Sequence, residues 1–375
     1  MKFLILNADY PEFIDWLYAR HPGLKNERYA EQLRARNESL YGMADFYSSN
    51  LRSLGHEADD CHANNLYLQQ AWVRENHPKV PCARKWHFRL RKKIIPWISK
   101  VGNPEWFYEV LAAQIRFSKP DVLLNQAMDS IPSSFLKEMK PYVGFLIGQH
   151  AATQLPKSED LSCYDLAVSS FPPTVDLFRQ NGLRAEYHRL GFEPRVLAQL
   201  ETNVKQFDIA FVGSLAATVH RSRIVLLEAL CSRFPELRIW GPNVDGLSEV
   251  SPIRAAHKGY AWGRDMYQIL CGSKLTLNHH GDIPPYANNC RLYEATGVGT
   301  VLITDWKPNL HEMFDPGKEV LAYRSIPESI ELIRHYLAHE NERQDIARAG
   351  QRRTLQDHTY YDRMGELVDI IHKYV

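Results

Sequence analysis

Short apolar runs alternate with longer segments of helical spacing in the N-terminal half of the chain. Phe3–Leu6 predicts a buried strand, and Met43–Leu54 predicts a helix that ends at Gly55. Further apolar runs that end in polar residues predict strands at 121–126, 142–150 and 165–170. This alternation is typical of a parallel sheet with crossover helices. Because ligands bind outside the carboxyl ends of such strands, six polar residues are expected on one rim: Asn7, Asp9, Gln126, Asp129, Gln149 and His150.

The same alternation restarts after the segment HRLGFEP, which ends at Pro194. The predicted strands of this second series are 207–214, 237–241, 274–280, 300–305 and 319–324. At 375 residues the chain is long enough for two cores. We therefore predict an α/β protein with two doubly wound domains that face a cleft, 1–200 and 201–357. The terminal segment 358–375 is predicted to be a helix that packs back toward the N-terminal domain.

Composition narrows the function classes. A formal net charge of +1 argues against a chain built to coat nucleic acid. The N-terminal apolar run is too short for a signal peptide, and no segment has the roughly 20 apolar residues that a spanning helix needs, so a cytoplasmic location is expected. The six cysteines include no C-x-x-C pair, which predicts reduced, packed thiols rather than a zinc cluster or a redox motif.

One segment departs from the balanced charge. Residues 83–100 hold seven Lys or Arg, no acid, and the aromatic residues Trp86, Phe88 and Trp97. We interpret the segment as a solvated helix with its aromatic side chains packed inward. The alternative is a surface that contacts a membrane or an anionic acceptor, and in that case peripheral contact through 84–100 is expected.

The first candidate for ligand chemistry is FVGSLAATVHRSR, residues 211–223. A strand ends at Gly213 and Ser214, and the helix that follows carries His220, Arg221 and Arg223 in its first turn. Free backbone N–H groups and the helix dipole favour an anion there. Cations oppose the dipole at that position, and a bound diphosphate would explain them. An ordinary strand-to-helix turn with exposed arginines is the alternative.

The second candidate is LNHHGDIPPYANNCRLYEATGVG, residues 277–299. His279 and His280 end a strand, and a helix capped by Asn289 carries Arg291 and Glu294. These last two are three residues apart and share a helical face. Arg291 can meet phosphate oxygens while Glu294 accepts hydrogen bonds from ribose hydroxyls, so one short helix could hold a nucleoside diphosphate.

The pattern N-x-R-x-x-E at residues 289–294, with a glycine pair and an apolar strand behind it, resembles the group 1 glycosyltransferases. In detail it is similar to their branch related to bacterial spore maturation protein B. LRSLGHEADD, KPDVLLNQ and HRLGFEP extend the resemblance over most of the chain. The resemblance implies the GT-B fold, with the acceptor in the N-terminal domain, a nucleotide-sugar in the C-terminal domain, and Glu294 on the donor ribose. Many relatives carry a second Glu seven residues upstream, where this chain has Ala287.

No D-x-D element is present, so the diphosphate charge is expected to be met by backbone N–H groups and by Arg221, Arg223 or Arg291. We therefore expect transfer without a metal or other cofactor. Most relatives retain the anomeric configuration, and the donor phosphate can then take the acceptor proton. Inversion would require a base, for which His150 and Asp9 are the candidates.

The neighbouring residues admit structural explanations as well. His279 and His280 are adjacent on a strand, point to opposite faces, and are not expected to bind a metal together. Tyr260 and Trp262 could stack on a nucleobase or pack in the core.

The function predicted from the sequence is a glycosyltransferase that uses UDP or GDP sugars and a glycan, lipid-linked or protein acceptor, as in polysaccharide biosynthesis. A nucleotide-sugar epimerase of the same fold and a non-catalytic nucleotide-sugar-binding protein remain as alternatives.

Overall fold

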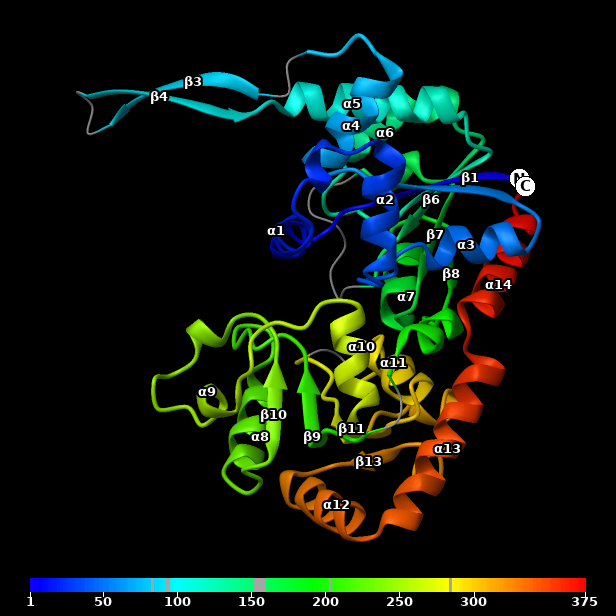
Figure 1. Ribbon diagram of the computed structural model, residues 1–375. Helices are drawn as coiled ribbons and strands as arrows, with labels where there is room; N and C mark the ends of the chain where they lie inside the picture. Colours follow the sequence, from blue (N-terminus) through cyan, green and yellow to red (C-terminus); the bar gives the residue numbers. More distant parts are fainter. Residues whose placement is uncertain (82–83, 92–94, 152–159, 202–203, 283–284) are drawn as a thin grey trace.

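Two parallel sheets form the framework of the computed structural model, which describes residues 1–81, 84–91, 95–151, 160–201, 204–282 and 285–375 (Figure 1). The first sheet has the strand order β2-β1-β5-β6-β7-β8. Its strands are β1 (Lys2–Asn7), β2 (Glu57–His62), β5 (Val122–Asn125), β6 (Phe145–Gln149), β7 (Leu166–Ser169) and β8 (Ala185–Tyr187). The helices of this half are α1 (Pro11–Arg20), α2 (Tyr29–Glu38), α3 (Phe46–Ser53), α4 (Leu66–Asn76), α5 (Pro104–Ser118), α6 (Ser133–Met139) and α7 (Pro172–Gln180).

The second sheet has the order β10-β9-β11-β12-β13, and all its pairings are parallel. Its strands are β9 (Phe207–Val212), β10 (Leu237–Trp240), β11 (Ser273–Leu277), β12 (Val301–Asp305) and β13 (Leu321–Tyr323). The helices are α8 (Arg221–Cys231), α9 (Ile253–Ala256), α10 (Arg264–Cys271), α11 (Arg291–Gly297), α12 (Ile326–Ala338), α13 (Glu340–Asp357) and α14 (Tyr360–His372). The predicted α/β architecture of two Rossmann-like sheets is confirmed.

The polar residues that follow the strands of the first sheet meet at its carboxyl edge, as parallel pairing requires. The Gln126 amide donates to Gln149 at 2.8 Å, and the Gln149 amide donates to the Tyr47 hydroxyl at 2.9 Å. Asp129 and His150 lie 3.7 Å apart, carboxylate to Nδ1. Four of the six expected rim residues therefore pair at this edge, Gln126 with Gln149 and Asp129 with His150.

The C-terminal helix crosses back to the first sheet, as predicted. α13 and α14 run along one side of the molecule, and the two chain ends lie close together (Figure 1). α14 packs on α3, and its buried Met364, Leu367 and Ile371 join a core cluster that also contains Phe3 and Phe46. Each sheet also has a core of its own.

The basic segment is not a helix. β3 (Arg84–Arg91) and β4 (Ile95–Gly102) form an antiparallel hairpin that projects from the first half (Figure 1). The sequence Lys-Trp-His-Phe-Arg-Leu at 85–90 alternates between polar and apolar residues, and this period of two favours a strand over a helix. The helical interpretation was therefore wrong.

Two further properties can be compared with the sequence. None of the helices in the described ranges combines the length and apolar character required to cross a bilayer. Five cysteines in the described ranges are free thiols, as expected for the reduced chain.

Arg363 is the largest side chain that is fully buried, with 2% of its surface exposed, and it ties α14 to the segment between the sheets. Its guanidinium donates to the carbonyl oxygens of Leu190 and Asp357, both at 3.0 Å, and to His358 Nδ1 at 2.7 Å.

We expect Arg363→Met to lower the free energy of unfolding by about 3 kcal/mol, because partly buried carbonyl groups lose a charged partner. Arg352→Met, at an exposed position on α13, is the control; denaturant unfolding showing equal stability for both variants would contradict this account.

Candidate functional site

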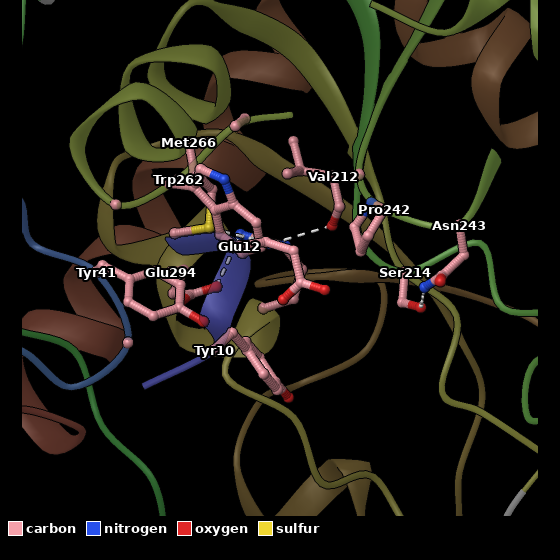
Figure 2. A pocket seen from close by; sticks show the side chains of 16 residues that line it. Tyr10, Glu12, Tyr41, Val212, Ser214, Pro242, Asn243, Trp262, Met266 and Glu294 are labelled. Atoms are coloured by element: carbon pink, nitrogen blue, oxygen red, sulfur yellow. Dashed lines mark hydrogen bonds and ion pairs between the residues drawn. The ribbon is translucent and has the colours of Figure 1, made fainter. Parts of the chain in front are cut away.

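A pocket of about 480 Å³ lies between the two halves of the chain. The first half contributes Tyr10, Glu12, Tyr41 and Gly42. The second half contributes the loops after β9 and β10, the segment before α10, and α11. Figure 2 shows Tyr10 and Tyr41 across the pocket from Pro242, Ser214 and Asn243. Both halves must be in place for this cavity to exist.

The loops after β9 and β10 approach each other closely enough to require glycine. Gly241 has a φ of +150°, and a Cβ there would lie 1.9 Å from the carbonyl oxygen of Gly213. The Gly213 N–H donates to the Trp240 carbonyl at 2.9 Å. Without a side chain at Gly241, backbone from both loops forms part of the pocket wall, where a ligand can approach it directly.

Arg291 and Glu294 lie together in the pocket. Arg291 Nη1 and a Glu294 carboxylate oxygen are 2.7 Å apart, with 12% and 13% of the side chains exposed. Arg291 Nη2 also donates to the Val212 carbonyl at 3.1 Å, whereas the buried Nε has no hydrogen-bond partner among the described residues. Burial raises the pKa of Glu294, and the Arg291 charge opposes that shift. The pair shares one face of α11 as the sequence predicted, and its polar atoms line a cavity.

Arg223 is not placed to bind a phosphate. Its Nε and Nη2 donate to the His279 carbonyl at 3.1 and 2.6 Å, and Nη1 donates to the Ser214 carbonyl at 2.9 Å. The side chain is buried, and desolvation lowers its pKa to about 10. Arg223 therefore holds the loop after β9 against the loop after β11. This corrects its expected role as a diphosphate ligand.

The start of α8 is occupied by the protein's own carboxylate. The Ser222 backbone N–H lies 3.3 and 3.4 Å from the two oxygens of Asp282, and the Ser222 hydroxyl donates to the same group. Arg221 and Asp282 line a separate open depression beside β12 and β13, not the pocket. The predicted anion site at this helix start is therefore filled by Asp282, whose charge suits the helix dipole.

His220 precedes α8 and is half-buried, and desolvation lowers its pKa to about 4. The uncharged form of this imidazole is therefore favoured in this structure. His220, like Arg221, is not among the residues that line the pocket.

His279 and His280 both contact Asp305 at the end of β12. His280 Nδ1 lies 2.7 Å and His279 Nδ1 3.5 Å from its carboxylate oxygens, and Lys307 Nζ lies at 3.1 Å. Burial alone would raise the pKa of Asp305, but the hydrogen bond and charge from His280 lower it below the usual range. These histidines support the strand ends and do not line the pocket, so donor contacts from them are not supported.

Asn289 does not cap α11. The helix begins at Arg291 with Cys290 as its cap residue, and no side chain caps it. Asn289 instead donates to the Asn278 side chain at 2.8 Å and lines a small interface cavity with Arg189. The Asn289 side chain therefore pairs with Asn278, just after β11, instead of capping α11.

Trp262 both lines the pocket and packs against the other half. Its ring meets Tyr41 edge-on, with centroids 5.2 Å apart, and Tyr41 stacks on Phe13 at 3.8 Å. Tyr260 is 56% exposed and stacks on the far side of Trp262 at 5.8 Å. Trp262 therefore packs against the other half, and its place in the pocket lining leaves stacking on a nucleobase as a prediction.

The two candidate bases lie outside the pocket lining. The Asp9 carboxylate is buried and bonded to Arg36 Nη2 at 2.5 Å, with His62 Nδ1 at 3.2 Å. Burial raises its pKa, but the charges of His62 and Arg36 outweigh burial and lower it, which leaves a poor proton acceptor. His150 is buried at the end of β6 and faces Asp129. The geometry supports neither residue as a base acting in this pocket.

Sequence reasoning missed the residues that the first half brings to the pocket. Glu12 lies in the first turn of α1 and is exposed, and Tyr10 and Tyr41 lie on the loops beside it. The only local signal was Pro11, which favours the first position of a helix and so marks an element directly after the first strand. Only the tertiary fold brings residues 10–12 opposite α11.

The comparisons with known proteins concern the fold and the C-terminal half of the chain. A family model described as glycosyl transferase-like matches residues 221–369, and no curated protein matches the chain. A glycosyltransferase from Rickettsia africae is structurally similar at a TM-score of 0.59 and 12% identity, covering 100% of this chain and 98% of that one. Anabaena HepE in complex with UDP-glucose gives 0.58 and 11%, covering 100% of both chains. Sucrose-phosphate synthase from Thermosynechococcus elongatus gives 0.57 and 10%, covering 100% and 99%.

These similarities, with both sheets covered end to end, show that the chain has the GT-B fold. The family match, in turn, spans α8 to α14 and includes the α11 pair. The pocket therefore lies between the two Rossmann-like halves of a GT-B protein whose C-terminal half is glycosyl transferase-like.

Arg223 offers a test of the assignment of cations. We expect Arg223→Met to lower the free energy of unfolding by about 2 kcal/mol, because two buried carbonyls lose charge-assisted hydrogen bonds. Arg221→Met, two residues away and exposed, should stay within about 0.5 kcal/mol of the wild type. Urea unfolding measures both, and an unchanged Arg223→Met would return this residue to the list of ligand-binding candidates.

Proposed function

We propose that this protein is a glycosyltransferase that binds a nucleotide diphosphate sugar in the pocket between its halves and transfers the sugar to an acceptor. The observation that carries the proposal is the Arg291–Glu294 pair, whose buried polar groups line that pocket together. A guanidinium with a free Nε and a carboxylate side by side suit the phosphate and ribose ends of one nucleotide.

The remaining walls supply the other contacts that such a donor needs. The Ser214 hydroxyl accepts from the Asn243 amide and can still donate to the diphosphate, whereas the Gly213 N–H already donates to the Trp240 carbonyl. Gly241, Asn243 and Trp262 also line the pocket, and the Trp262 ring would stack on a nucleobase. The volume of 480 Å³ falls within the usual range for ligand pockets, about 300–1,000 Å³.

UDP and GDP sugars both remain candidates, and UDP is favoured by a similar solved structure that contains UDP-glucose.

We propose transfer without a metal ion or other cofactor. Of the cations named from the sequence, Arg291 is the one that lines the pocket, and with the backbone N–H groups it would meet the diphosphate charge. Retention of configuration and a place in the branch related to spore maturation protein B follow from the sequence resemblance.

The acceptor is proposed to be a glycan, a lipid-linked glycan or a protein, as in polysaccharide synthesis in the cytoplasm. The projecting hairpin β3–β4 carries most of the basic segment and belongs to the half expected to bind the acceptor. Contact with an anionic acceptor or with the inner face of a membrane through 84–100 is part of the proposal.

Glu12 replaces Asp9 and His150 as the candidate for proton transfer. It is an exposed carboxylate of the first half that lines the pocket (Figure 2). In an inverting reaction it would accept the acceptor proton, and in a retaining reaction it would position the acceptor hydroxyl.

Nucleotide binding tests the donor site. In calorimetric titrations of UDP, GDP, ADP and CMP in EDTA, we expect one nucleotide to bind, and Glu294→Gln and Arg291→Met to weaken it about tenfold to a hundredfold. Each variant removes a charged hydrogen-bonding group worth about 1.5–3 kcal/mol. Glu331→Gln, at an exposed position on α12, is the matched control.

Absence of binding by every nucleotide to the folded wild-type protein would overturn the proposal. If a nucleotide binds, the masses of the products separate the alternatives. Transfer gives free nucleotide and a heavier acceptor. An epimerase would leave the masses of the nucleotide sugar and of the acceptor unchanged, and a binding protein would give no product.

Glu12 gives a separate expectation once an acceptor is known. If transfer inverts the configuration, Glu12→Gln should lower kcat about a hundredfold or more while nucleotide affinity stays near that of the wild type, because the amide cannot take a proton. If transfer retains the configuration, the donor phosphate takes the proton and the amide still positions the acceptor hydroxyl, so kcat should fall by less. Asp15→Asn, at an exposed position on the same helix α1, should leave kcat unchanged. Steady-state kinetics with calorimetry decide, and an unchanged kcat in Glu12→Gln would remove Glu12 from the reaction.

A further inference from the structure

Three metal-ligating side chains converge where α12 meets α13, away from the pocket. His335 lies in the last turn of α12, His339 joins the two helices, and Glu342 lies in the first turn of α13. One ligand atom from each of the three lies within 4.8 Å of the others. His335 Nε2 and the Glu342 carboxylate are 2.8 Å apart.

The hydrogen bonding of His339 prepares it as a ligand. His339 Nδ1 lies 2.8 Å from the His335 carbonyl oxygen. A carbonyl can only accept, so Nδ1 carries the proton and the Nε2 lone pair of the neutral ring is free. Metal-binding histidines usually donate their other ring N–H to such an acceptor.

The backbone between the two helices is fixed by Arg343. Its Nη1 donates to the carbonyls of Tyr336 and Leu337, at 2.7 and 3.2 Å, and 10% of the side chain is exposed. The His339 N–H also donates to the His335 carbonyl at 2.9 Å, and the Arg343 N–H donates to the His339 carbonyl at 3.0 Å. The three ligand residues therefore stand on a rigid junction, which favours a preorganised site.

We propose that His335, His339 and Glu342 bind one divalent ion of the zinc class, which links α12 to α13. Two imidazoles and a carboxylate are a ligand set that zinc accepts, with the fourth position open to water. Ligand atoms around a tetrahedral zinc lie about 3.3 Å apart. The rings of His335 and His339 are stacked, with centroids 4.1 Å apart and planes 15° from parallel, so one ring must turn out of the stack to direct its lone pair at the shared ion. None of the three residues lines the pocket, so the site is independent of donor binding.

Zinc titration of the tag-free, chelator-treated full chain tests this proposal. We expect saturable binding of one Zn²⁺ per chain by calorimetry and a rise in melting temperature with Zn²⁺. His339→Ala and His335→Ala should each weaken binding about tenfold or more and abolish the rise in melting temperature. Glu342→Gln should weaken it about tenfold, whereas Glu340→Gln, at an exposed position in the same turn of α13, should bind as the wild type does.

Two results would overturn the proposal. One is the absence of saturable zinc binding in the wild type, in which case the histidines only complement the negative end of the α12 dipole. The other is undiminished binding in His335→Ala and His339→Ala, which would place the ion elsewhere. All these residues are exposed, so circular dichroism and the metal-free melting temperature can show that each variant is folded.

Discussion

Backbone pairing between two connecting segments holds the sheets in position relative to each other. The Phe192 N–H donates to the His358 carbonyl at 2.8 Å, and the Tyr360 N–H donates to the Phe192 carbonyl at 2.9 Å. A Cβ at Gly191 would lie 3.1 Å from the same stretch, so only glycine allows this approach without displacement. α14 follows directly and packs on α3. The pocket depends on this pairing because its two walls come from different halves.

The charged residues of the second half differ in whether their hydrogen bonds are already made within the protein. Arg223 and Asp282 satisfy groups of the protein itself, the first at two loop carbonyls and the second at the start of α8. Arg291 has a partner in Glu294 and still has a donor without one in the described ranges. An unpaired buried donor costs free energy, and a ligand that accepts from it would recover that cost. This unpaired N–H group, rather than the number of cations, is the reason for placing the diphosphate at Arg291 in the proposed nucleotide site.

Two kinds of site are thus separated in the second half. The proposed donor site uses the carboxyl edge of the sheet, where strand ends and short loops converge. The proposed zinc site lies at a junction between two helices that the pocket does not reach. One can therefore be disabled without the other.

The sequence by itself determined the two series of strands, the terminal helix and the Arg291–Glu294 face, because each follows from local periodicity or from spacing within one helix. The hairpin β3–β4 was misassigned as a helix, although the residues at 85–90 alternate between polar and apolar. Tertiary structure alone decided which polar groups remain free for a ligand. The side chains of Arg223, Asp9 and Asn289 are hydrogen-bonded within the protein. Their partners lie 56, 27 and 11 residues away in the sequence, and such distant pairings leave no local pattern. Tertiary structure also decided that Glu12 lines the pocket, because the opposite wall is formed by residues of the second half.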